Sequence, residues 1–170
     1  MMYDVYLSLG ANLGDRRLAL ETAINALKNV PEINVQQISS LYQTAPVGGV
    51  KQDDFYNCAL YLRTSLTPTD LLVKLHQIEA AGKRQRKIHW GPRTIDLDIL
   101  VYDDLKIQTK SLTIPHSQMH RRSFVLVPLL EITTGKLHKQ TLILLQRLGD
   151  QQRIEKIGSV FNEADRVEKN

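Results

Sequence analysis

The order in which strand-like and helix-like patterns follow one another limits the possible folds of this chain most strongly. In four segments apolar residues favour one face of an extended chain, which is typical of half-buried strands, and in two segments they recur at helical spacing. We expect strands at residues 3–9, 33–42, 55–64 and 94–102, and helices at 15–29 and 68–82. The segment at 33–42 is the least regular of the strands.

Residues with special backbone preferences mark the ends of these elements. Gly10 follows the first strand, and we interpret Gly10 and Gly14 as turn residues. Pro31 marks the exit from the first helix. Thr67 is a good N-cap for the second helix, and Pro68 suits its first helical position because proline has no N–H to leave unsatisfied there.

The resulting order, βαββαβ, predicts an α+β fold of the ferredoxin-like sandwich type. The remaining third of the chain is interpreted as C-terminal strand and helix elaborations. We expect short strands near 106–108 and 123–127, and a helix at 139–148 with Leu142, Leu145 and Leu148 directed inward. The length of 170 residues suits one domain, which we place at 1–158, followed by a polar tail at 159–170.

Composition excludes several classes of protein. Apolar residues make up 42% of the chain and charged residues 24%, as in ordinary globular domains. The N-terminal residues lack the basic and apolar regions of a signal peptide, and no segment approaches 18 uninterrupted apolar residues, so we expect a cytoplasmic protein. The single cysteine, Cys58, allows neither an internal disulfide nor a cysteine-based zinc site.

Positive charge is concentrated in one short segment. The chain carries a net charge of +4, yet residues 83–93 contain five basic side chains and no acid: Lys83, Arg84, Arg86, Lys87 and Arg93. Such a run is more often a solvated face than a binding site. Here two aspartates follow it directly, which favours an anionic ligand.

Asp96 and Asp98 lie two residues apart in the strand expected at 94–102. Ile95, Leu97, Ile99 and Val101 would face the core, so the two aspartates share the opposite face. Their spacing is roughly 6.6 Å along a strand, and two charges at about that distance repel by roughly 3 kcal/mol at an effective dielectric constant near 20. A cation between them would relieve this repulsion, whereas the simpler alternative is two solvated side chains.

Magnesium is the cation that this arrangement favours. Magnesium prefers oxygen ligands and commonly binds one or two carboxylates together with substrate phosphates, while arginines nearby would hold the remaining phosphate oxygens. The glycine-containing segment "GANLGDRR" lacks the G-K-[ST] ending of a P-loop, so a P-loop nucleotide fold is excluded.

Five stretches then carry a family resemblance, in the order in which the family has them. They are "YLSLGANLGDR", "SSLYQTAPVG", "DFYNCAL", "RQRKIHWGPRTIDLDIL" and "LTIPHSQMHRRSFVLVPLLEI", between residue 6 and about 132. The chain resembles the 6-hydroxymethyl-7,8-dihydropterin pyrophosphokinases of folate biosynthesis, which move a diphosphate from ATP to a pterin alcohol. The combination of W-G-P-R-T-I-D-L-D with a later I-P-H is highly specific.

The resemblance implies a role for individual residues. It implies two Mg²⁺ ions bound with ATP by Asp96 and Asp98, and Arg84 and Arg93 as catalytic residues on loops that close over ATP. For the pterin it implies Thr44, Val47, Phe55, Asn57, Trp90 and Phe124. For ATP it implies Glu79, Arg86, Ile99, Thr113, His116 and Arg122.

One pair of these residues is also supported by position alone. Phe55 and Asn57 share a face of the strand at 55–64, where a ring can stack on a flat ligand and an amide offers both a donor and an acceptor. Two positions depart from the family pattern: Ala45 stands where proline is frequent, and Ser117 where some members have tyrosine. Ser117 puts in question one phosphate contact that the resemblance implies.

The sequence leaves three alternatives to this function. His116 and His120 have the spacing of helical zinc ligands, but no third ligand is evident in the sequence. A ferredoxin-like sheet with a basic loop could bind single-stranded RNA, although the aromatic strand signatures are missing and the aspartates would repel phosphate. A different magnesium-dependent kinase is the third. We expect a monomer that binds neither nucleic acid nor membrane.

Overall fold

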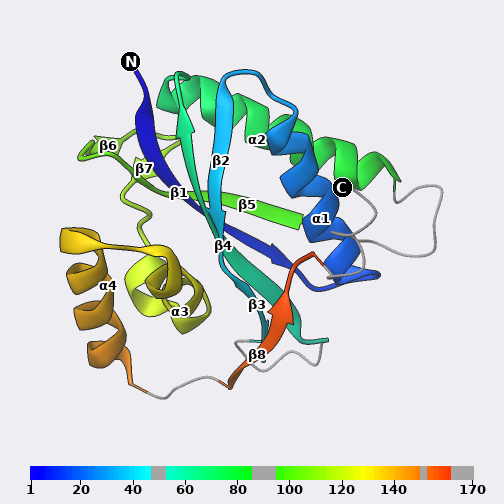
Figure 1. Cartoon of the computed structure of the whole chain (residues 1–170), viewed down its shortest axis with the longest axis vertical. Coiled ribbons are helices and arrows are strands. Elements are labelled where there is room, and N and C mark those ends of the chain that lie inside the picture. The colour runs from blue at the N-terminus through cyan, green and yellow to red at the C-terminus, as the bar shows by residue number, and fades with distance from the viewer. Residues whose placement is uncertain (47–52, 86–94, 150–152, 162–170) are drawn as a thin grey trace.

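The computed structural model of the chain describes residues 1–46, 53–85, 95–149 and 153–161 (Figure 1). An antiparallel sheet forms its centre, with strand order β5-β1-β4-β3-β8 and with β2 also paired to β4. The strands are β1 (Tyr3–Ala11), β2 (Ile33–Ile38), β3 (Ser40–Thr44), β4 (Phe55–Thr64), β5 (Ile95–Tyr102) and β8 (Ile154–Ser159). The central position of β1 between β4 and β5 is that of a ferredoxin-like sheet, so the predicted fold is confirmed.

Helices cover both faces of this sheet. Figure 1 shows α1 (Arg16–Lys28) and α2 (Pro68–Gln85) together on one face, and α3 (Ser123–Ile132) and α4 (Gly135–Leu148) on the other. The larger core cluster joins the sheet to α1 and α2 through residues such as Leu20, Ile24 and Leu71. A smaller cluster around Leu126 and Leu129 joins the sheet to α3. Each face of the sheet therefore carries a buried cluster, while much of β2 and β8 stays exposed or half-buried.

Capping residues mark the start of both helices of the βαββαβ unit. Asp15 caps α1, its side chain accepting a hydrogen bond from the Leu18 N–H. Thr67 caps α2 through a 3.2 Å hydrogen bond from the Asp70 N–H, and Pro68 is the first helical residue, as predicted. α2 continues beyond Gly82 to Gln85, so the predicted end was three residues too early.

Strand boundaries differ from the prediction at two places. β1 runs through Gly10 to Ala11, so Gly10 is not a turn residue, whereas Gly14, with a φ of 66°, is one. The segment predicted as one strand at 33–42 is divided into β2 and β3 at Ser39. There the Ser39 hydroxyl accepts a hydrogen bond from the Ala59 N–H. β2 pairs with one end of β4, and after the interruption β3 pairs with the other end.

A β-bulge changes the predicted alternation in β5. Tyr6 and Leu7 of β1 pair with Val101 and Ile99, which leaves Leu100 as the extra residue. Leu100 and Val101 accordingly pack with the smaller cluster on the α3 face. The prediction that Val101 shares the core face of Ile99 was therefore wrong, because it assumed unbroken alternation.

The C-terminal third departs furthest from the prediction. Residues 123–127, predicted as a strand, form the first half of α3. The helix predicted at 139–148 begins four residues earlier, and Leu142 is 37% exposed while Leu145 and Leu148 pack inward. Two short strands, β6 (Ile107–Gln108) and β7 (Thr113–Ile114), pair with each other and are followed by the 3₁₀ helix η1 (Met119–Arg121). Val160 and Phe161, expected in the polar tail, pack against the larger core.

Candidate active site

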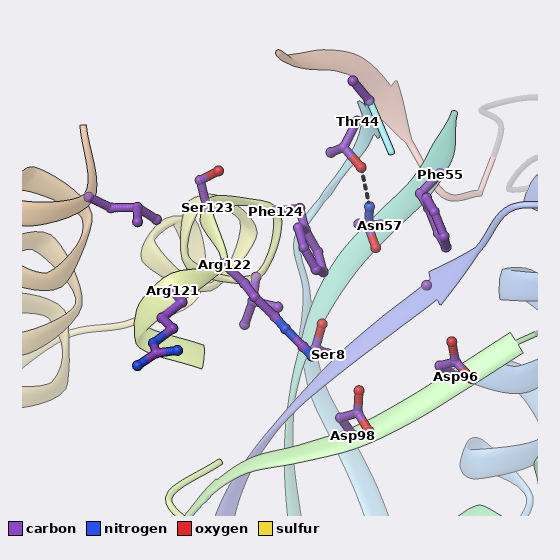
Figure 2. Close-up of a pocket in the computed structure, with 14 residues that line it drawn as sticks. Ser8, Thr44, Phe55, Asn57, Asp96, Asp98, Arg121, Arg122, Ser123 and Phe124 are labelled. Carbon is purple, nitrogen blue, oxygen red and sulfur yellow. Dashed lines mark hydrogen bonds between the residues drawn. The ribbon is translucent and has the colours of Figure 1, made fainter. Parts of the chain in front are cut away.

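A pocket of about 510 Å³ opens on the α3 face of the sheet, where β1, β4 and β5 meet the N-terminus of α3 (Figure 2). It has an acidic end on β5 and an amide and aromatic wall on β3, β4 and α3. Its lining residues are Ser8, Gly10, Thr44, Ala45, Phe55, Asn57, Asp96, Asp98, Arg121, Arg122, Ser123, Phe124, Val125 and Leu148. The predicted aspartates and much of the predicted pterin wall therefore line one cavity.

Asp96 and Asp98 form the acidic end of the pocket. They alternate with Ile95, Leu97 and Ile99, which are buried on the other face of β5, as the strand pattern predicted. Asp96 is exposed and Asp98 is half-buried, and they stand opposite Gly10 and Ser8 of β1. This pair of carboxylates on one face is the donor set that magnesium prefers.

The described ranges of the chain contain no denser group of metal ligands than this pair. There, no three histidine, cysteine, aspartate or glutamate side chains gather closely enough to hold a metal. A magnesium ion at Asp96 and Asp98 would thus take further ligands from water or from a substrate, which is its usual arrangement beside phosphates. His116 Nδ1 accepts a hydrogen bond from the Gln118 N–H, and His120 Nε2 accepts one from Arg121 Nε, contacts that favour neither as a zinc ligand.

The amide wall of the pocket is built by adjacent strands. Asn57 is only 2% exposed, and its Nδ2 donates a 2.7 Å hydrogen bond to Thr44 Oγ1 across the β3–β4 pair. Figure 2 shows the rings of Phe55 and Phe124 on either side of Asn57. A flat ligand inserted between these rings would present its edge to a buried, oriented amide.

Gly10 allows the Asn57 amide to lie where it does. A Cβ added at Gly10 would stand 2.8 Å from Asn57 Oδ1, closer than ordinary van der Waals contact permits. Because the amide is buried and already hydrogen-bonded to Thr44, it cannot simply move into solvent. Gly10 is thus required for close packing within the sheet, and the turn interpretation missed this role.

We expect Gly10→Ala to lower kcat/KM for a pterin acceptor by roughly 10- to 100-fold, because a displaced amide misaligns the acceptor. Nucleotide affinity, measured on the same variant by calorimetry, should stay near the wild-type value and serves as the internal control. Unchanged kcat/KM would show that the Asn57 amide does not orient the acceptor.

Two arginines approach the pocket from the start of α3. Arg122 was predicted, and its guanidinium carbon lies 5.8 Å from the centre of the Phe124 ring. Arg121 was not predicted, although it directly precedes Arg122 in the quoted motif. Together they give the pocket cationic groups beside the acidic end.

Glu131 fixes α3 to the sheet. Its Oε1 accepts hydrogen bonds from the Ser40 N–H at 2.8 Å and the Ser40 hydroxyl at 2.7 Å, and its Oε2 accepts one from the Tyr42 hydroxyl. Burial alone would raise the pKa of Glu131, but these hydrogen bonds outweigh it and lower the pKa. The charged carboxylate therefore helps to set the position of Phe124 and Arg122.

Other residues predicted to contact ATP lie outside the lining of this pocket. Glu79 Oε1 accepts a 2.8 Å hydrogen bond from the N–H of Leu97, the residue between Asp96 and Asp98 in the sequence. This hydrogen bond ties α2 to β5. Burial raises the pKa of Glu79 despite this hydrogen bond, and the charges of Asp96 and Asp98 raise it further. The Ile99 side chain is 4% exposed within the core, so only its backbone could meet a nucleotide.

Thr113 and His116 follow the short second sheet. Thr113 is exposed in β7, and His116 is half-buried, with its backbone N–H donating to the Leu100 carbonyl. Burial lowers the pKa of His116; Asp98 opposes this effect and Arg122 reinforces it. Val47, Arg86, Trp90 and Arg93 lie outside the described residues, as does the side chain of Arg84.

Taken together, the fold and the pocket define a class of protein: a ferredoxin-like α+β domain that presents paired carboxylates and arginines next to an aromatic and amide wall. Residues 6–134 match the family model of 7,8-dihydro-6-hydroxymethylpterin-pyrophosphokinase. The chain belongs to this family.

Curated relatives agree with this assignment. The 2-amino-4-hydroxy-6-hydroxymethyldihydropteridine pyrophosphokinase of Bacillus subtilis is 45% identical over 127 residues, which cover 75% of this chain and 76% of the relative. The bifunctional protein FolKE of Lactococcus lactis subsp. lactis is 50% identical over 131 residues, or 77% of this chain. The chain spans only 38% of the length of that bifunctional relative.

Solved structures support the fold. An HPPK-DHPS protein crystallised in complex with substrates aligns with a TM-score of 0.66 at 13% identity, over 85% of this chain and 43% of that one. The Plasmodium falciparum HPPK-DHPS with pterin and p-hydroxybenzoate gives a TM-score of 0.65 at 18% identity, over 86% and 43%. Within the described ranges of this chain, no helix has the length and apolar character needed to cross a membrane.

Proposed function

We propose that this chain transfers diphosphate from ATP to the hydroxymethyl group of 6-hydroxymethyl-7,8-dihydropterin and releases AMP, as a step of folate biosynthesis. The observation that carries the proposal is the presence, in one pocket, of an acidic pair and an aromatic and amide wall. Family membership supports the reaction, and the two ends of the pocket have the chemical character that the two substrates need. A cytoplasmic, monomeric enzyme remains a prediction from the sequence.

The pterin is assigned to the wall formed by Phe55, Asn57 and Phe124. A pterin is flat, so its faces suit the two rings, and its polar edge suits the buried Asn57 amide. The hydrogen bond to Thr44 holds this amide in one orientation before the ligand arrives. Such preorganisation reduces the entropy that binding would otherwise cost. Val47 and Trp90 remain predicted pterin contacts from the family resemblance.

The polyphosphate is assigned to the acidic end. Two Mg²⁺ ions held there by Asp96 and Asp98 would neutralise phosphate charge and polarise the phosphoryl oxygens when bound. Arg121 and Arg122 lie on the α3 side of the same pocket and suit oxygens that no metal reaches. Arg84 and Arg93 as catalytic residues, and Arg86, Glu79, Ile99 and Thr113 as ATP-binding residues, are carried over from the family.

His116 suits a role as a neutral hydrogen-bond donor. Its Nδ1 accepts a hydrogen bond from the Gln118 N–H, so in the neutral form the proton resides on Nε2. Burial lowers the pKa of His116, which favours this neutral form near pH 7. We assign the Nε2–H to a phosphate oxygen of ATP.

The reaction that follows is a displacement at phosphorus. The alcohol oxygen of the pterin attacks the β-phosphorus, the bond from that phosphorus to the oxygen bridging the α- and β-phosphates breaks, and AMP departs with that oxygen. The alcohol proton is released to water. Positioning and charge stabilisation contribute most of the catalysis in such transfers.

We expect the purified protein, given ATP, Mg²⁺ and 6-hydroxymethyl-7,8-dihydropterin, to release AMP in equal amount to the pterin diphosphate formed. Chromatographic separation of nucleotides measures this directly, and a sample with excess EDTA should show no turnover. Release of ADP would indicate single phosphoryl transfer by another type of kinase. Absence of turnover would favour a binding module, an alternative that gives the acidic pair no role.

A further inference from the structure

Ser8 occupies the floor of the pocket, but neither the sequence patterns nor the family resemblance assigns it a role. Its side chain is 7% exposed and lines the cavity. On β1 it pairs in register with Asp98 of β5 and with Ala59 of β4. In Figure 2, Ser8 lies between Phe124 and Asp98 in the view. It is therefore placed where the two ends of the pocket meet.

The hydrogen bonding of the Ser8 hydroxyl differs from that of other buried polar side chains. Six other buried polar side chains each make at least one hydrogen bond within the chain: Ser39, Thr44, Asn57, Thr64, Thr133 and Thr141. Among the residues that the structure describes, Ser8 Oγ makes no hydrogen bond. Burying a hydroxyl without a partner costs free energy, and native structures seldom keep such a group without a reason. A ligand that enters the pocket would satisfy it.

The place of β1 in the sheet indicates which ligand atom Ser8 meets. β1 runs between β4, which carries the Asn57 amide assigned to the pterin ring, and β5, which carries the acidic pair assigned to phosphate. Ser8, in register with Asp98, therefore lies between the two ends of the pocket. Between ring and phosphate lies the hydroxymethyl group of the acceptor.

We propose that the Ser8 hydroxyl forms a hydrogen bond with the alcohol oxygen of the acceptor and holds this nucleophile beside the acidic pair. The inference rests on the proposed function and adds a substrate-binding residue to it. The hydrogen bond positions the oxygen, and no proton transfer to Ser8 is involved. The proposal explains why a buried hydroxyl faces the cavity without a partner.

A chemical double-mutant cycle tests this hydrogen bond. Affinities of 6-hydroxymethylpterin and 6-methylpterin, which lacks the alcohol, are measured by calorimetry for the wild type and for Ser8→Ala. In the wild type, loss of the ligand hydroxyl should weaken binding roughly 3- to 10-fold, the usual contribution of one neutral hydrogen bond. In Ser8→Ala the two pterins should bind equally. If Ser8→Ala weakens both ligands by the same factor, or neither, the proposal is wrong.

Thermal unfolding gives an independent readout. Ser8→Ala removes an unsatisfied hydroxyl, so its midpoint without ligand should equal or exceed that of the wild type. Ser39→Ala is the matched control: it removes a buried hydroxyl that is hydrogen-bonded outside the pocket lining. Ser39→Ala should unfold at a lower temperature and keep the wild-type preference for the hydroxymethyl ligand. A lowered midpoint in Ser8→Ala would indicate a structural role and overturn the proposal.

Pterin binding and AMP release by the wild type separate a failure of this inference from a failure of the proposed function. If the wild type binds neither pterin and releases no AMP, both are wrong. If the wild type binds pterins and releases AMP, but Ser8→Ala retains the full preference for the hydroxymethyl ligand, only the role of Ser8 is wrong.

Discussion

Asp98→Asn should lower the rate of AMP release by roughly 100- to 1000-fold, the usual loss when one preorganised electrostatic group is removed from an active site. Asparagine has nearly the same shape as aspartate but no charge, so the variant removes half of the acidic pair and little else. Asp96→Asn should have a comparable effect. Neither change removes a core side chain, because both aspartates lie on the pocket face of β5. Thermal unfolding should therefore stay near that of the wild type.

The metal dependence of nucleotide binding gives a second measurement on the same variants. With one carboxylate fewer, a higher Mg²⁺ concentration should be needed for half-maximal binding of a non-hydrolysable ATP analogue. Asp104→Asn is the control for the change in net charge, since Asp104 is exposed and outside the pocket lining. An Asp98→Asn enzyme with near-wild-type turnover and metal dependence would mean that the acidic pair does not hold the metal.

The sequence predicted the parts of the fold in which local pattern and tertiary environment agree. β4 was predicted at its observed bounds, and β1 and β5 to within two residues, because each has one face in the larger core. The start of α2 was predicted because Thr67 and Pro68 act locally. These signals depend on neighbouring residues alone, so they can be recognised without knowing what the segment packs against.

The failures occur where packing decides the structure. The segment "SFVLVPLLEI" is apolar almost throughout, so its periodicity cannot distinguish a buried helix from a buried strand. It becomes α3 because it is enclosed between the sheet and α4. β8 was missed because none of its six residues is buried, so it lacks a clear apolar face. It is an edge strand that depends on pairing with β3, more than a hundred residues earlier in the chain. The bulge at Leu100 likewise has no local signal.

The site shows the same division. Strand parity alone placed Asp96 with Asp98 and Phe55 near Asn57, but the roles of Arg122 and Phe124 came only from the family resemblance. Their position at the start of a helix was not predicted. Gly10 was misinterpreted because glycine after an apolar run usually indicates a turn. Its actual role depends on a contact across β1 and β4. Ser8 was not singled out from the sequence, because its burial depends on the packing of three neighbouring strands and α3 around it.

Asn57→Leu should lower kcat/KM for the pterin by about 100-fold or more, because a pocket built to hydrogen-bond a polar edge loses both its donor and its acceptor. Leucine has the same branched arrangement of heavy atoms as asparagine, with methyl groups in place of Oδ1 and Nδ2, so the change removes the hydrogen-bonding groups and keeps the branching of the side chain. Affinity for an ATP analogue, measured by calorimetry, should change little, since Asn57 lies at the end of the pocket away from Asp98. Binding of pterin at wild-type affinity would contradict the assignment of the amide wall.

Thr44→Val separates recognition of the pterin from stability of the wall. Both variants remove the 2.7 Å hydrogen bond between Asn57 Nδ2 and Thr44 Oγ1, and each should lower the free energy of unfolding by about 1–3 kcal/mol. Only Asn57→Leu also removes the amide that faces the ligand, so its loss of pterin affinity should be much the larger. Equal losses of affinity in the two variants would show that the hydrogen bond between the strands, and not a contact with the pterin, accounts for the effect of Asn57.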